Sequence, residues 1–102
     1  MTATEERRWI REYLALQNAN AKMDSQLDDG EWKRRIVPGR REEFSLICMN
    51  PEHDKPLFSI AIQRESTLKD AHIEIWAQKM VGQAIKYAEA YIRGGVWRGA
   101  RS

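Results

Sequence analysis

The sequence contains a single cysteine, Cys48, and only two histidines among its 102 residues. One cysteine excludes an internal disulfide, and it leaves no cysteine pair at the spacing of a zinc site. Three prolines and six glycines are too few for a fibrous or low-complexity chain. We therefore expect an intracellular domain that holds no metal and no cofactor.

Long hydrophobic runs are also missing. No stretch approaches the roughly 20 apolar residues that span a bilayer. The first residues, MTATEERRW, are charged and have no apolar segment behind them. We expect a cytoplasmic protein without a membrane partner. The net charge of +2 is weak evidence for a polyanionic partner.

Few residues in the sequence could carry catalysis, which requires titratable groups with matched pKa values held close together. His53 lies between Glu52 and Asp54 in a turn-rich segment, and His72 lies near the start of a predicted helix. We interpret both histidines as solvated or structural residues. Cys48 is expected to face the core as a small apolar side chain. No catalytic residue and no enzymatic activity is predicted.

What the chain does contain is a succession of periodic patterns. Apolar residues at three- to four-residue steps predict a helix over about 4–27, inside a helical region 1–29. Thr2 and Glu5 fit a capping box at its start, and Gly30 marks its end. The apolar stripe consists of Trp9, Tyr13, Leu16, Met23 and Leu27, widened by Ile10 and Leu14.

Residues 31–65 are predicted to form an antiparallel meander. The segments 43–49 and 57–64 are short and rich in β-forming residues, and a turn-rich stretch joins them. Side chains alternate along a strand, so each strand has one core face. The predicted core faces are Phe44, Leu46 and Cys48, and Phe58, Ile60 and Ile62. Ser45, Ile47 and Met49 point the other way, and this partly apolar second face fits either a further layer or a partner.

The last long segment is predicted to be helical over 67–93. Thr67 and Asp70 repeat the capping-box pattern, so the helix should start near Leu68. Its residues are apolar on more than one side, which indicates a helix that is well buried or shared between subunits. Residues 71–77 also alternate as a strand would, and that alternative stays open. We expect a flexible basic tail over 94–102.

The patterns together predict an α+β fold in one domain, residues 1–102. The N-terminal helix is followed by a two- or three-stranded antiparallel β-meander. The long C-terminal helix is expected to pack on one face of the sheet. No internal repeat interrupts this layout.

The most distinctive stretch is KRRIVPGRRE, residues 33–42, which places five cations around a Pro-Gly step. If a strand folds back at this step, a two-residue loop places Arg35 opposite Glu42. A three-residue loop instead places Trp32 opposite Phe44 on the core face, and we prefer it because it keeps the two aromatic rings together. Either register leaves the two arginines after the Pro-Gly step without a cross-strand partner.

We predict a small non-enzymatic interaction module that binds a protein partner, such as an accessory regulator or inhibitor of the kind that mobile elements encode. Arginine and tryptophan are typical hot-spot residues of such surfaces. The alternative is a nucleic-acid-binding or small RNA-cleaving toxin-type protein that uses the basic hairpin. The predicted partner-binding residues are Trp32, Arg34, Arg35, Arg40, Arg41, Trp97 and Arg98. A homodimer through Trp76, Tyr87 and Tyr91 is a further hypothesis.

Overall fold

The computed structural model describes residues 2–23, 32–50, 55–65 and 67–94. Its three strands form one antiparallel sheet in the order β1-β2-β3. The fold belongs to the α+β class, as predicted, and the meander has three strands. The elements are α1 (Ala3–Lys22), β1 (Lys33–Pro38), the 3-10 turn η1 (Arg40–Glu42), β2 (Phe44–Asn50), β3 (Lys55–Ile62), the 3-10 turn η2 (Asp70–His72) and α2 (Ile73–Arg93).

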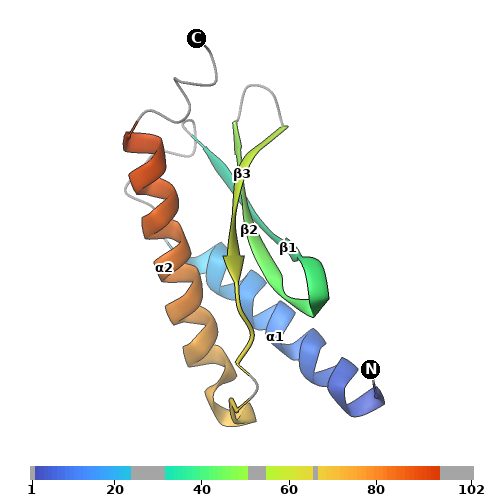
Figure 1. Ribbon diagram of the computed structural model, residues 1–102. Coiled ribbons are helices and arrows are strands. Elements are labelled where there is room, and N and C mark those ends of the chain that lie inside the picture. The colour runs from blue at the N-terminus through green and yellow to red at the C-terminus, as the bar shows by residue number, and fades with distance from the viewer. Residues whose placement is uncertain (1, 24–31, 51–54, 66, 95–102) are drawn as a thin grey trace.

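Both helices pack against the same face of the sheet (Figure 1). α2 runs beside β3, and α1 passes behind the strands, where it contacts β1 and α2. The strand side chains that alternate toward the helices form the sheet's part of the core. They are Ile36, Phe44, Leu46, Cys48 and Ile62, all buried, with Phe58 and Ile60 partly buried beside them. The predicted core face of the sheet is therefore confirmed.

α1 begins and ends at residues with clear capping geometry. The backbone N–H of Glu5 donates to the Thr2 hydroxyl over 3.2 Å, which confirms the predicted cap. At the other end Met23 is already extended, with a ψ of 129°. The helix therefore stops at Lys22, and the prediction that it continues to about Leu27 is wrong.

The buried face of α1 is narrower than the predicted stripe. Leu16 is fully buried, and the rings of Trp9 and Tyr13 lie 5.2 and 5.7 Å from the ring of Phe44. Ile10 and Leu14 were expected to widen this face, yet they are 44% and 54% exposed. The helix rests on the sheet along one line of residues, so side chains on its flanks remain in solvent.

The hairpin between β1 and β2 has neither of the predicted registers. Arg34 lies opposite Cys48, so the connection runs through residues 39–43 and Glu42 lies in the turn. A Pro-Gly step favours a type II turn, whose twist does not suit a tight hairpin. The chain instead turns with Arg41 and Glu42 in the left-handed region, at φ values of 53° and 64°. The predicted pairings of Arg35 with Glu42 and of Trp32 with Phe44 are therefore both wrong.

α2 starts later than its capping pattern predicts. The predicted start near Leu68 is wrong, because the α-helix begins at Ile73 after the turn η2. The Leu68 carbonyl and the Asp70 carboxylate both accept hydrogen bonds from Arg8 of α1, so these residues serve as a contact rather than as a first helical turn. The strand alternative for residues 71–77 is also wrong.

Replacing Phe44 with Ala should lower the free energy of unfolding by about 3 to 5 kcal/mol, because its ring is fully buried between the helices and the sheet. Urea denaturation followed by circular dichroism measures the loss. Ile75→Ala is the matched control, since that side chain is 67% exposed and its removal should change stability by less than about 0.5 kcal/mol. Equal losses for the two variants would contradict this core.

Candidate functional site

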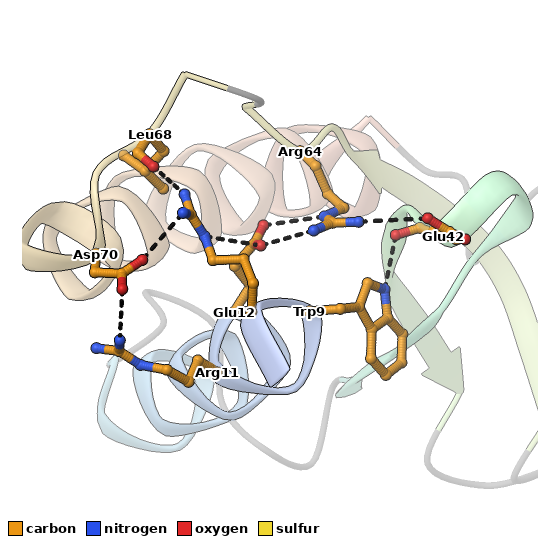
Figure 2. Close-up of polar contacts among 8 residues, drawn as sticks. Trp9, Arg11, Glu12, Glu42, Arg64, Leu68 and Asp70 are labelled. Carbon is orange, nitrogen blue, oxygen red and sulfur yellow. Dashed lines mark hydrogen bonds and ion pairs between the residues drawn. The ribbon is translucent and has the colours of Figure 1, made fainter. Parts of the chain in front are cut away.

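Glu12 is the most deeply buried charged side chain among the described residues, with 1% of its surface exposed. Its two carboxylate oxygens accept hydrogen bonds from Nε and Nη2 of Arg64 over 3.1 and 2.9 Å, and Nε of Arg8 lies 3.4 Å away (Figure 2). Paired donors on a carboxylate form the strongest kind of ion pair. The hydrogen bond to Glu12 raises the pKa of the Arg64 guanidinium, while burial acts in the opposite direction.

The second arginine of this cluster connects α1 to the start of α2. One Nη atom of Arg8 donates to Asp70 Oδ1 over 3.0 Å, and the other donates to the Leu68 carbonyl. Arg11 adds an ion pair of 3.3 Å to the other oxygen of Asp70. Figure 2 shows these residues converging from the two segments. Because Asp70 is mostly exposed, its ion pairs are weaker than that of the buried carboxylate.

The β1–β2 turn is held by contacts from two other elements. The indole Nε1 of Trp9 donates to the Glu42 carbonyl over 2.8 Å, and Nη1 of Arg64 lies 3.7 Å from the Glu42 carboxylate (Figure 2). A left-handed conformation costs an ordinary residue roughly 1 to 2 kcal/mol. The contacts from α1 and from the end of β3 therefore fix a turn whose Arg41 and Glu42 both have positive φ.

Glu12 went unnoticed in the sequence, although a signal was present. It follows Trp9 by three residues and precedes Leu16 by four, so it lies on the buried side of the helix. A carboxylate in that position needs a cation or a set of hydrogen bonds. The pattern could have identified the buried carboxylate, but not Arg64, which lies 52 residues away.

Two of the predicted partner-binding residues face the interior instead. The Arg34 guanidinium donates to the Asn20 side chain over 2.6 Å and to the carbonyls of Asn20 and Met23. It therefore satisfies the C-terminal carbonyls of α1, where a cation also suits the helix dipole. Trp32 is 2% exposed, and its ring lies 5.6 Å from the same guanidinium. Arg34 and Trp32 join α1 to β1 and present little surface to a partner.

The other cations of the basic stretch are exposed. Arg35, Arg40 and Arg41 make no side-chain hydrogen bond or ion pair within the described part of the chain. They do not form one patch, because Arg35 lies on β1 and the other two follow its end. At about 3.3 Å per strand residue, Arg35 and Arg40 are separated by roughly 15 Å. Lys33 accompanies Arg35 at the start of the strand.

On the side of the sheet away from the helices, two rows of side chains form what we call the open face, and Lys33 and Met49 lie beyond them at its end. Neither helix covers it, and its middle is apolar or small rather than charged, which differs from the polar outer face usual in antiparallel sheets. Val37, Ser45 and Ile47 of the open face are half-buried, and Arg35, Ser59 and Ala61 are exposed. The register places Arg35, Ile47 and Ser59 in one row and Val37, Ser45 and Ala61 in the next.

The predicted dimer residues are divided between surface and core. Tyr87 and Tyr91 are 65% and 55% exposed, and the ring of Tyr91 lies 5.5 Å from that of Phe58 in β3. Trp76 is 6% exposed and belongs to the core. The two tyrosines therefore lie at the surface on the side of α2 that borders β3. Five residues named in the sequence analysis as cap, stripe, site or partner-binding residues lie outside the described part of the chain: Leu27, Gly30, His53, Trp97 and Arg98.

Cys48 is fully buried in the core, as expected. Burial raises the pKa of its thiol to about 12, although the nearby positive charge of Arg34 acts against this shift. A thiol with such a pKa stays protonated near neutral pH and is a poor nucleophile. His72 is exposed at the start of α2 and makes no side-chain capping bond there.

Within the ranges that the structure describes, no three His, Cys, Asp or Glu side chains are grouped so that they could hold a metal ion. No described helix is both long enough and apolar enough to cross a membrane. Comparison of the chain with protein-family models, with curated proteins and with solved structures finds no match. The candidate binding surfaces of the chain are the open face, the exposed arginines and the tyrosines of α2.

Replacing Glu12 with Gln should cost about 3 kcal/mol of stability or more, because it leaves two arginines beside a buried neutral side chain. Thermal or urea unfolding of the purified variant measures the cost. Asp70→Asn is the matched control, since it removes an exposed partner of the same arginine and should cost no more than about 1 kcal/mol. Similar losses for both would show that the Glu12 pair does not dominate this cluster.

Cys48 should resist alkylation by iodoacetamide in the folded protein at pH 8 and react once urea unfolds the chain. Its folded pKa of about 12 lies above the ordinary value of 9.0. The protonated thiol therefore stabilises the fold fully below about pH 9, and this contribution is lost as pH rises toward 12. Mass spectrometry of the adduct measures the difference, and rapid labelling without urea would contradict a buried thiol.

Proposed function

We propose that the chain is a small protein-binding module that uses the open face of its sheet. The observation that carries this proposal is that both helices cover the same side, which leaves an uncharged centre around Val37 and Ile47 on the other side. Apolar side chains that are only half-buried on an uncovered face are typical of interaction sites. The two rows of this face contain Arg35 as their one charged residue and no His, Cys, Asp or Glu, which favours a binding role over a catalytic one.

The charge beside this centre indicates the chemistry of the partner. Arg35 lies in the same cross-strand row as Ile47, and Lys33 is exposed two residues before it. A partner segment with apolar side chains and an acidic residue beside them would match both features. The predicted Arg/Trp surface is thereby reduced to Arg35 and its neighbours, because Trp32 and Arg34 face inward. The narrower roles of regulator or inhibitor stay predictions, motivated by size alone.

The nucleic-acid alternative has weaker support from the described residues. Proteins that bind single strands without sequence preference stack bases on exposed aromatic rings. The two rows of the open face contain no aromatic side chain, and Trp32, the aromatic residue of the basic stretch, is buried. The exposed arginines of this stretch are also separated, with Arg35 within β1 and Arg40 and Arg41 in the turn η1 beyond its end, and do not form one continuous track. These features favour a protein partner.

Selection from a random peptide library displayed on phage tests the proposal. Peptides that combine apolar residues with Asp or Glu should be enriched. Arg35→Glu should weaken their binding by about tenfold or more, because it places a like charge beside the acidic residue. Ile47→Thr should weaken it by roughly five- to tenfold while retaining a β-branched side chain. Isothermal titration with a selected peptide measures both effects.

Arg41→Gly is the matched control for these variants. It removes one positive charge at a position outside the open face. Glycine suits the φ of 53° at residue 41, so the fold should be retained. Peptide binding should be unchanged. Peptides that bind the wild type and both open-face variants equally would refute this use of the face. Tight binding of a random single-stranded oligonucleotide that falls steeply with salt would favour the nucleic-acid alternative.

A further inference from the structure

The two edges of the sheet differ in how well they are protected. At the β1 edge, the Tyr13 hydroxyl donates to the Ile36 carbonyl over 3.4 Å, Pro38 has no backbone N–H, and α1 packs alongside. Such features prevent an edge strand from pairing with another chain. Among the described residues β3 pairs only with β2, and its stretch from Leu57 to Ile62 carries no charge. β3 is the open edge of this sheet.

The alternation of hydrogen bonds identifies the backbone groups that β3 leaves unpaired within the sheet. Gly39 donates to the Glu43 carbonyl over 2.7 Å, so the odd-numbered residues of β2 bond to β1 and the even-numbered ones bond to β3. In the register of β2 with β3, the even-numbered residues lie opposite even-numbered residues such as Ile60. The N–H and C=O groups of Ser59 and Ala61 therefore point toward the open edge.

α2 borders this edge with an uncharged stripe. Tyr91 contacts Phe58 of β3, whereas Gly82 on the other flank of the helix faces Met23 of α1. On the flank toward β3, residues follow one another at alternating steps of four and three, the spacing with which two helices pack along a seam. They are Trp76, Met80, Gln83, Tyr87 and Ala90. Tyr87 in the middle of this stripe is 65% exposed.

We propose that the β3 edge pairs with the β3 edge of a second copy of this chain, antiparallel about a two-fold axis through Ile60. In this register Ser59 of each copy lies opposite Ala61 of the other, so the outward N–H and C=O groups of both residues find partners. An axis perpendicular to the sheet keeps all four helices on one face. The uncharged stripes of the two α2 helices then face each other, and the Tyr87 side chains, exposed in the single chain, become buried between them.

Charge favours a second copy over an unrelated strand. Residues 55 and 65 are equally far from this axis along the chain, so Lys55 of each chain lies at the same end of the strand pair as Glu65 of the other. Because β3 shifts its register opposite Cys48 and Met49, these two long, exposed side chains meet across the edge and not directly opposite each other. A two-fold axis makes this ion pair twice. An axis through Ser59 would instead place Lys55 opposite Gln63. The interface brings together only the outer members of the two rows, Ser59 and Ala61, and leaves Arg35, Val37 and Ile47 of the open face uncovered, so it can form with or without the function proposed above.

Sedimentation equilibrium of the full chain at about 100 µM should show twice the single-chain mass of 11.9 kDa. Ser59→Pro removes an outward N–H while leaving the bonds to β2 intact, and proline is tolerated at such an edge position. It should raise the dimer dissociation constant by at least about tenfold, with an unchanged circular dichroism spectrum. In hydrogen exchange, the amides of Ser59 and Ala61 should be protected in the wild type, and the amide of Ala61 should lose its protection in this variant, in which residue 59 has no amide hydrogen.

A charge exchange tests the register. Lys55→Glu should weaken the dimer by roughly tenfold, and adding Glu65→Lys should restore it. Ile75→Glu, on a face of α2 away from the stripe, is the control and should leave the dimer unchanged. A wild-type mass of one chain overturns the proposal. A dimer that Ser59→Pro leaves intact also overturns it, and a charge exchange without recovery overturns the assigned register.

Discussion

The buried ion pair between Glu12 and Arg64 is the interaction on which the arrangement of the other parts depends. A carboxylate that is 1% exposed is stable only while its cations stay in place, since an unpaired charge in the core costs several kcal/mol. Arg64 lies just beyond β3, so the pair sets where α1 sits relative to the sheet. From that position α1 also reaches the β1–β2 turn through Trp9 and the start of α2 through Arg8.

The chain divides its arginines between internal bonding and surface charge. Arg8, Arg34 and Arg64 donate to carboxylates and carbonyl oxygens inside the fold, and guanidinium groups suit this because they offer several donors in a fixed plane. The exposed arginines of the described residues are spread over α1, β1, η1 and α2 and are not gathered on one surface. This division explains why the arginines of the basic stretch differ in role. Arg34 binds carbonyl groups inside the fold, Arg35 is a charge on the open face, and Arg40 and Arg41 lie apart from it in the turn.

The local patterns predicted the elements, whereas contacts between distant residues decided their ends. Alternation along β2 correctly placed Phe44, Leu46 and Cys48 in the core, because the two-residue period of a strand is a property of its own backbone. The hairpin register could not be predicted in the same way, since Trp9 and Arg64 stabilise the turn from other elements. The start of α2 was missed for a similar reason: Arg8 binds Asp70, 62 residues away. Trp32 looked like a surface anchor because a single sequence does not reveal that α1 ends against it.

The protection of only one edge of the sheet limits how the molecule can grow. With the β1 edge covered by Tyr13 and Pro38, β3 is, among the described strands, the one to which another strand can be added. Once two such edges meet, no further edge remains, so addition ends at a closed pair and cannot continue into a fibre. A loss of the cover at β1 would give each chain two sites for addition. Tyr13 and Pro38 thereby guard against polymerisation as well as completing a local packing contact.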